Sequence, residues 1–419
     1  MSELQRLTDD TRTDIISFAK ERYTDDPDIA ELGDYLPFLT YFGEERWAGE
    51  QVEQSRSAIN RSARPSDRED TLVGLLEYYE LTGDESALAL SENYFDYLLS
   101  TFLRDSRIVT PCLNRVARKA EYARYNHHSA VVRAVMRLAD VGLSLVSDRQ
   151  IPPYQALPRN GVFIELLVDL YEITGERCWL KSAQTIADAW LETPTFRQYG
   201  LFPRPNILFW REPMEVKIFK GNTGVVNGLL ALCRVGAGQQ YADAVARWCD
   251  AVYDRCVNST VYGQYRLATG DRYRPELLFS FAYLDVLCYA DVVTDTDGYL
   301  EKARSVADFW LTRQSDIGLF PFRPSSDHSF QDAMTDFSIS LLRLSERTDD
   351  PTYGRAARKG IEALFRYHRF PLWVDVETGD PIDDEIQPRY VTLMSKAIIA
   401  LEVDSIFDDV STFKLLRDR

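Results

Sequence analysis

Arginines recur in the loops that lead into the most apolar segments of this chain. One stands shortly before nearly every such segment, at Arg159, Arg211, Arg274, Arg323 and Arg389. Converging guanidinium groups bind a carboxylate or a phosphate through paired hydrogen bonds, so these positions are our candidates for binding an acidic substrate group. The alternative is that arginine is simply the usual cation here, because only nine of the 48 basic residues are lysines.

Two of those nine lysines, Lys217 and Lys220, stand within four residues of each other beside the sequence GNTG. A lysine enclosed among arginines and shielded from water has a lowered pKa and can act as a general base. We therefore take both as candidate catalytic residues. A pair of solvated loop lysines explains the pattern equally well.

Carboxylates stand in the same loops. Glu276 and Asp332 are candidate catalytic acids or bases, because two carboxylates that flank a glycosidic bond can hydrolyse it. Asp332 and Asp336 are four residues apart and share a helical face if the helix begins early enough. For Asp336 we favour a different role, as the cap at the start of a helix.

Histidine and aromatic side chains add to these loops. His328, in SSDHSFQD, is a candidate acid, base or hydrogen-bond donor, whereas His368 is expected to be structural. Trp210, Tyr273 and Tyr390 could stack on a sugar ring, although ordinary packing explains most aromatic residues in such a chain. No metal-ligand spacing is visible, so we expect no metal. There is also no GxGxxG after a strand and no P-loop, so we expect no cofactor.

The elements that carry these loops are helices in a repeated pattern: an apolar helix, a short polar turn, an amphipathic helix and a long loop. Copies begin at Thr71, Gly161, Gly224, Phe279 and Asp336. The first helix of each copy is apolar on nearly all sides and must be buried, while the second has one apolar stripe. We therefore expect an inner ring of first helices and an outer ring of second helices.

Other segments supply the remaining helices, namely residues 9–60, 126–147 and 392–403. The total we expect is twelve helices in six hairpins. Because no linker divides the chain, we expect one domain over residues 1–419. The short turns at 82–84, 174–176 and 349–351 each combine the end of one helix with the cap of the next.

The clearest copies, TLVGLLEYYELTGD and GVFIELLVDLYEITGE, resemble the six-hairpin (α/α) toroid superfamily of glycoside hydrolases, polysaccharide lyases and sugar epimerases. The resemblance implies an all-α (α/α)6 toroid in which the long loops build the active site on one face. Physical reasoning agrees, because inner helices direct their free N–H groups and positive dipole ends toward that face.

The chain is strongly acidic, with a formal net charge of −17. An acidic surface with arginine in place of lysine is typical of halophilic archaea and unsuited to nucleic acid. The N-terminus lacks a signal-peptide pattern, and no apolar run is long enough to span a membrane. The six cysteines lack CxxC spacing and are expected to be buried thiols. We therefore expect a cytoplasmic protein.

These features predict a carbohydrate-active protein that acts on an acidic glycan containing hexuronic acid. The chain also resembles an N-glycosylation protein of haloarchaea, which implies a lipid-linked or nucleotide-linked glycan as partner and other glycosylation enzymes nearby, in surface-layer biogenesis. Hydrolysis, β-elimination and epimerisation or isomerisation all stay open as reactions. The alternatives are a non-catalytic toroid that binds glycan or scaffolds the pathway, and a catabolic glycoside hydrolase.

Overall fold

The computed structural model describes residues 3–24, 32–61, 69–99, 160–202, 215–218, 222–294, 298–382, 389–403 and 405–406. The helix expected over residues 126–147 lies outside these ranges.

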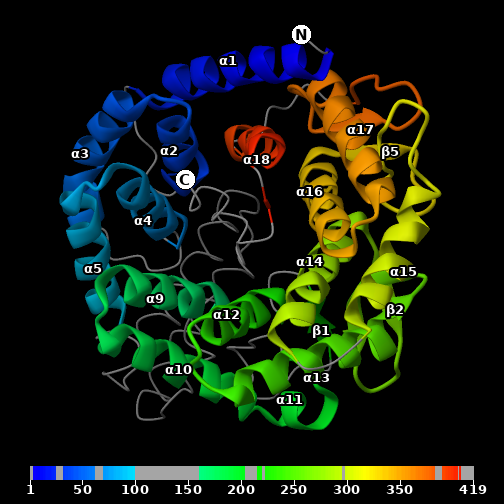
Figure 1. The fold of residues 1–419 in the computed structure, drawn as a ribbon, viewed down its shortest axis with the longest axis horizontal. Coiled ribbons are helices and arrows are strands. Elements are labelled where there is room, and N and C mark those ends of the chain that lie inside the picture. The colour runs from blue at the N-terminus through cyan, green and yellow to red at the C-terminus, as the bar shows by residue number, and fades with distance from the viewer. Residues whose placement is uncertain are drawn as a thin grey trace, which may run out of the picture.

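Two concentric rings of helices form the molecule (Figure 1). The inner ring consists of α2 (Leu32–Tyr41), α4 (Glu69–Thr82), α9 (Asn160–Thr174), α12 (Thr223–Arg234), α14 (Leu277–Val293), α16 (Gln331–Thr348) and α18 (Tyr390–Glu402). The outer ring consists of α1 (Glu3–Tyr23), α3 (Glu45–Arg61), α5 (Glu85–Leu99), α10 (Arg177–Leu191), α13 (Gln239–Cys256), α15 (Tyr299–Leu311) and α17 (Pro351–Tyr367). Each inner helix contacts the next, and α18 contacts α2, which closes the ring.

This arrangement confirms the predicted all-α toroid of inner and outer helices. Within the described ranges each ring holds seven helices, one hairpin more than the twelve helices expected. The additional hairpin is α2 with α3. Helix α2 is buried along nearly its whole length like the other inner helices, but it has only ten residues and contains Pro37, which is unusual inside a helix.

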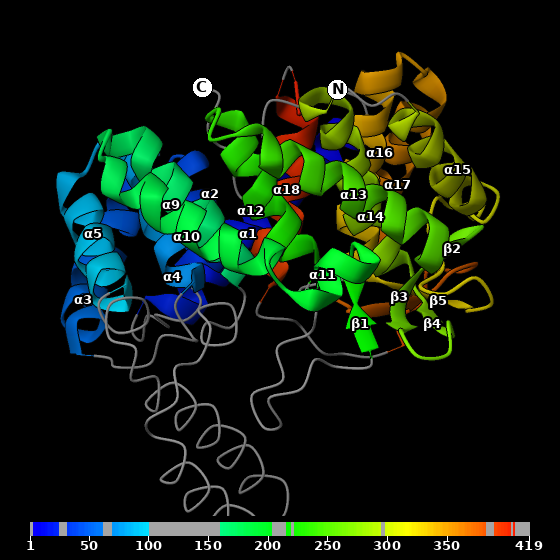
Figure 2. The same cartoon turned by 90° about the horizontal axis from the view of Figure 1, so that it is seen from below.

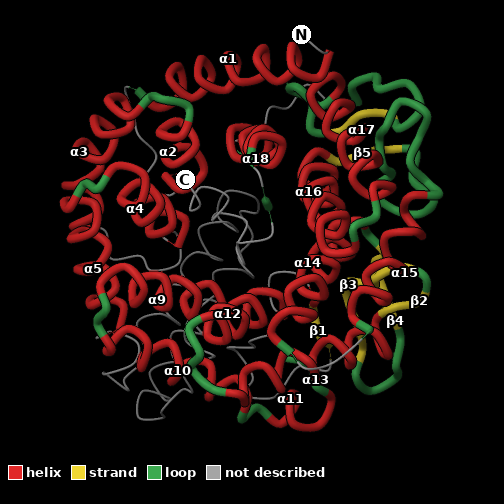
Figure 3. The backbone as a smooth tube through the Cα atoms, in the orientation of Figure 1, coloured by secondary structure: helices red, strands yellow, loops and turns green. Residues whose placement is uncertain are grey.

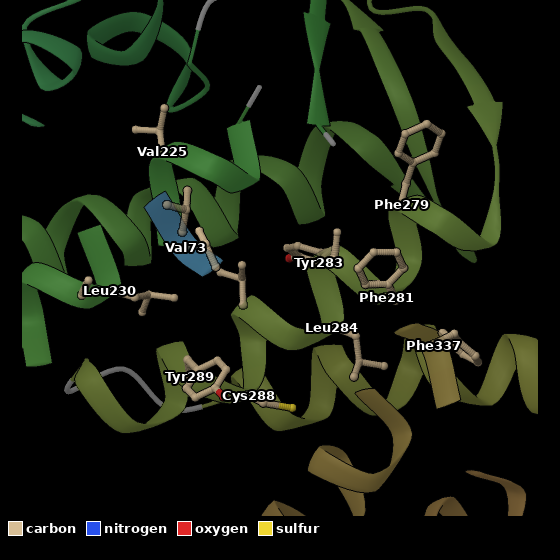
Figure 4. Packing of buried hydrophobic residues seen from close by; sticks show 14 of the residues in the cluster. Val73, Val225, Leu230, Phe279, Phe281, Tyr283, Leu284, Cys288, Tyr289 and Phe337 are labelled. Atoms are coloured by element: carbon tan, nitrogen blue, oxygen red, sulfur yellow. The ribbon is translucent and has the colours of Figure 1, made fainter. Parts of the chain in front are cut away.

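Burial follows the two rings. Helix α14 is buried on nearly all sides, and Figure 4 shows Val73 of α4, Leu230 of α12 and Phe337 of α16 in the same apolar core. Outer helix α17 instead buries one stripe that includes Tyr353 and Ile361. The difference is the one expected when a helix is enclosed by neighbours or has one face in water.

Short turns join each inner helix to the outer helix that follows. Gly83 and Gly175 adopt the left-handed conformation between the helices of two hairpins, with φ of 71° at both. Asp349 does the same in a third hairpin, and the Asp350 side chain caps α17 by accepting a hydrogen bond from Thr352 N. The predicted turn positions are therefore confirmed.

Short strands, which we did not expect, occupy the long loops before the inner helices. They are β1 (Glu215–Lys217), β2 (Val257–Asn258), β3 (Thr260–Arg266), β4 (Arg272–Pro275), β5 (His328–Phe330) and β6 (Trp373–Asp375). All pairings are antiparallel: β3 pairs with β1, β2 and β4, and β5 pairs with β6. Figure 2 shows β1, β3, β4 and β5 on one face of the toroid, which we call the loop face, and Figure 3 shows how small a part of the fold the strands are.

Two further expectations concern membrane and thiols. None of the helices in the described ranges is both long and apolar enough to cross a membrane. The described cysteines are all free: Cys249, Cys256 and Cys288 are buried as expected, whereas Cys233 is only partly buried and Cys178 is exposed.

Candidate functional site

Three neighbouring inner helices, α14, α16 and α18, begin with charged residues. Glu276 is the N-cap of α14, Asp332 lies in the first turn of α16, and Arg389 is the N-cap of α18. Because α16 packs against both α14 and α18, these helix starts adjoin one another. Free N–H groups and the positive ends of the helix dipoles add to the electrostatic potential there.

Glu276 holds two arginines at the start of α14. Its carboxylate is fully buried and accepts two hydrogen bonds from Arg274, Nε to Oε1 and Nη2 to Oε2, both 3.0 Å long. Arg323 Nη2 donates to Oε1 at 2.9 Å. The two arginine side chains are 47% and 54% exposed, so two accessible guanidiniums share one buried carboxylate and the group carries a net positive charge. The structure therefore brings together three of the predicted site residues.

Aromatic rings and backbone bonds hold these arginines in place. The Arg274 guanidinium lies 5.6 Å from the centre of the Phe279 ring, and that of Arg323 lies 5.5 Å from the Phe322 ring. Leu277 N donates to Phe322 O at 2.9 Å, which fixes the Arg323 loop to the start of α14.

The backbone of Arg274 is itself unusual. Its φ of 61° places a non-glycine residue in the left-handed region, at a cost of about 1–3 kcal/mol. Such conformations persist where the surrounding contacts determine them, and they cluster at functional sites. Here the paired hydrogen bonds to Glu276 are the contacts that hold it.

A second group of charges links α16, α18 and α2. Arg389 Nη1 donates to Asp332 Oδ2 at 3.1 Å, and Arg389 Nε lies 3.8 Å from Asp34 Oδ1. Thr392 Oγ1 lies 2.8 Å from both the backbone oxygen and Oδ1 of Asp34. The predicted residues Asp332 and Arg389 are therefore ion-paired, and they lie next to an aspartate that the sequence did not single out.

One helical turn further along, Asp336 pairs with Lys396 of α18, with Oδ1 and Nζ 3.6 Å apart. Burial raises the pKa of Asp336, Lys396 opposes that change, and Asp332 adds to it. The prediction that Asp336 caps the helix is wrong. Helix α16 begins five residues earlier, with Phe330 as its N-cap, so Asp336 lies in the helix on the same face as Asp332.

The other predicted residues in the described ranges lie around these two groups. Lys217, half-buried in β1, and Tyr273, exposed in β4, pair in register with Gln264 from its two sides, so the three side chains share one sheet face. The His328 ring is exposed at 3.1 Å from Asp327, while its backbone oxygen accepts a hydrogen bond from Phe322 N.

Tyr390 is fully buried, with its ring 5.4 Å from that of Phe18 and 5.5 Å from that of Phe370. In this structure the ring presents no face to a ligand, because its neighbours cover it. Four other predicted residues, Arg159, Trp210, Arg211 and Lys220, lie outside the described residues.

Sequence reasoning missed Lys396 and Asp34. Lys396 lies in a helix that is otherwise apolar, and a buried lysine needs a nearby carboxylate. That mismatch was a usable signal, but it does not say where in the chain the carboxylate is. Within the described ranges, no three His, Cys, Asp or Glu side chains converge as metal ligands.

No family model matches this chain, and no curated protein matches it. Several solved structures share its fold. Cellobiose 2-epimerase from Bacillus thermoamylovorans superposes with a TM-score of 0.53 and 11% identity, covering 79% of this chain and 86% of its own. D-mannose isomerase does so with a TM-score of 0.52 and 11% identity, covering 79% and 85%. An unsaturated glucuronyl hydrolase from Streptococcus agalactiae follows with 0.51 and 12%, covering 80% and 81%. At such identities the likeness establishes the fold alone: the chain has the α/α toroid fold of these enzymes, with seven hairpins among its described residues where the resemblance implied six.

Proposed function

We propose that this protein is a carbohydrate-active enzyme that binds the carboxylate of a hexuronic acid through Arg274 and Arg323. The observation that carries the proposal is the sharing of one buried carboxylate, Glu276, by two half-exposed guanidiniums. Glu276 occupies Nε and one Nη of Arg274 and a single Nη of Arg323, which leaves other N–H groups of both side chains for a ligand. A guanidinium held in place by its neighbours binds a carboxylate with little loss of side-chain freedom.

The chemistry would take place at the adjoining start of α16. Asp332 is partly exposed, and a carboxylate there can accept hydrogen bonds from sugar hydroxyls and exchange a proton with the sugar. If the proton lies alpha to the bound carboxylate, the arginines would stabilise the negative charge that develops. This geometry favours epimerisation, isomerisation or elimination, while hydrolysis would need a second carboxylate across the glycosidic bond.

The biological setting of the proposal comes from the sequence. Its acidic, lysine-poor composition and toroid pattern resemble the haloarchaeal N-glycosylation protein AglQ. We therefore place the reaction in the cytoplasm, on a lipid-linked or nucleotide-linked acidic glycan destined for surface-layer protein, with other glycosylation enzymes as neighbours. We also propose that residues 1–419 form a single domain that carries this activity.

The first test is binding. Isothermal titration with glucuronate and with glucose, in concentrated KCl, should show binding of the acid only. Arg274→Ala and Arg323→Ala should each weaken it about 10-fold to 100-fold, the effect expected when one charge-assisted hydrogen bond is lost. Arg46→Ala is the matched control, since that arginine is exposed on outer helix α3. Equal binding of glucose and glucuronate would overturn the proposal.

A second test identifies the reaction. Uronate-containing glycans are incubated with the enzyme in D2O. Deuterium at the carbon alpha to the carboxylate of an uncleaved glycan indicates epimerisation or isomerisation. An unsaturated uronate together with a new reducing end indicates elimination, and a new reducing end without an unsaturated uronate indicates hydrolysis. Binding without any of the three products favours the non-catalytic alternative.

A further inference from the structure

The pair formed by Asp336 and Lys396 has no role in the function proposed above. Lys396 is 2% exposed and Asp336 is 7% exposed, so both charges lie in the protein interior between α16 and α18. Buried lysine and aspartate are rare, because water solvates their charged forms far better than protein does. Their presence therefore needs an explanation.

Stability does not supply that explanation. The 3.6 Å between Nζ and Oδ1 is too long for a good hydrogen bond, and Asp336 Oδ1 accepts no hydrogen bond from the described residues. Well-packed apolar residues of similar volume often serve a protein at least as well as a buried ion pair. Buried charges with altered protonation are instead frequent at functional sites.

The position of the pair connects it to Asp332. Asp332 and Asp336 are four residues apart in α16, hence neighbours on one helical face. The charged groups that face Asp336 are Lys396 and Arg389 of α18, Asp332 of its own helix and Asp285 of α14. Burial raises the pKa of Asp336 and Lys396 counteracts the change, so the charge of Asp336 depends on Lys396.

We propose that Asp336 and Lys396 are positioning residues that set the basicity of Asp332, the residue that exchanges a proton with the sugar. The role of Asp332 rests on the proposed function. When Asp332 acts as a base, a C–H or O–H bond of the sugar breaks and an O–H bond forms on Asp332. An ionised Asp336 one turn away favours the protonated form of Asp332, and the positive charge of Lys396 favours the ionised form of Asp336 against the effect of burial.

Carboxyl titration tests this without any sugar. Protein labelled with 13C at the aspartate carboxyls is titrated by NMR, and the two signals are assigned from Asp332→Asn and Asp336→Asn. Asp336→Asn should lower the titration midpoint of Asp332, because it removes the negative charge one helical turn away. Lys396→Met should raise the midpoint of Asp336, and Lys396→Arg should restore it. An unchanged Asp332 midpoint in Asp336→Asn would overturn the proposal.

A stability measurement separates a structural role from a functional one. The double variant Asp336→Leu with Lys396→Met replaces both charges by apolar groups, and it should unfold at the same or a higher temperature than the wild type. A clearly lower melting temperature would show that the pair serves the fold, against the proposal.

A kinetic arm then follows on any substrate found above. Lys396→Met should move the pH profile of kcat/KM while Lys396→Arg keeps it, and an unmoved profile would contradict the proposal. Failure of glucuronate to bind defeats the proposed function alone, because the titration needs no ligand.

Discussion

His368 shows how much one buried side chain can do. It ends α17, it is fully buried, and its ring nitrogens lie 3.1 Å from Pro371 O and 3.0 Å from Ser329 Oγ. Its backbone oxygen accepts a hydrogen bond from the side chain of Gln331, the first residue of α16. The prediction that His368 is structural agrees with these contacts, which join the end of α17 to β5 and to the start of α16.

The same burial makes stability depend on pH. Burial lowers the pKa of His368 from 6.5 to about 4. Below pH 6.5 the unfolded chain takes up a proton that the folded ring does not, so this contribution to stability is lost as the pH falls toward 4. Between pH 7.5 and 4.5, urea titrations should show a loss of about 2–3 kcal/mol from this group.

His368→Gln should remove that part of the pH dependence, although the variant will be less stable at pH 7.5. His328→Gln is the control for replacing a histidine by glutamine, since the His328 ring is exposed. An identical slope in wild type and His368→Gln would show that another group is responsible.

Among single site residues, the sequence predicted those that stand in the loops before inner helices. Arg274, Glu276 and Arg323 stand in loops before inner helices, and helix periodicity alone identifies those loops. Lys396 lies within an apolar helix, 60 positions from Asp336, and no local pattern in either segment joins them. The contact between these two residues can be identified only from the folded structure, in which α16 and α18 pack against each other.

At the scale of elements, a close contact between β3 and α14 positions the Phe279 ring on which Arg274 lies. A Cβ at Gly263 of β3 would lie 2.1–2.3 Å from the Phe279 ring atoms, so the missing side chain is what lets α14 approach the sheet. Gly263→Ala should therefore displace the ring beneath Arg274, cost about 1–3 kcal/mol of unfolding free energy and weaken glucuronate binding.

Gly224→Ala in α12 is the control, because nothing lies within 4 Å of its added Cβ. An alanine in a helix is favoured over glycine by roughly 0.5–1 kcal/mol, so this variant should be as stable as the wild type or more so. Denaturant unfolding measures both variants. Equal stability of Gly263→Ala and wild type would mean that the contact is not tight.

Helices were predictable and strands were not. The inner helices begin within two residues of the predicted positions for four of the five copies, from α4 at Glu69 to α14 at Leu277. The exception is α16, where the polar sequence QDAMTD hid the first turn. The strands have two to seven residues, too few for an alternating pattern to stand out from a loop.

For the whole molecule, the net charge of −17 predicts a strong dependence on salt. Like charges repel in the compact state, and raising KCl from about 0.1 M to about 2 M shortens the screening length from about 10 Å to under 3 Å. The melting temperature should therefore rise by several degrees or more. Sucrose at matched osmolality is the control for general exclusion effects. A melting temperature that is constant or falls in KCl would contradict the halophilic interpretation.

The closed ring also has a consequence for how the protein is made. Thr392 of α18 donates a hydrogen bond to Asp34 of α2, and α18 packs against both α1 and α2. The ring is therefore closed by contacts between helices from the two ends of the described chain. On the ribosome, Asp34 emerges some 350 residues before its partner. The arginine pair at Glu276 can form earlier, whereas the charges around Asp332 and Asp336 must wait for Arg389 and Lys396. If the proposed roles hold, a nascent chain completes the group that binds the carboxylate before it completes the group that exchanges the proton.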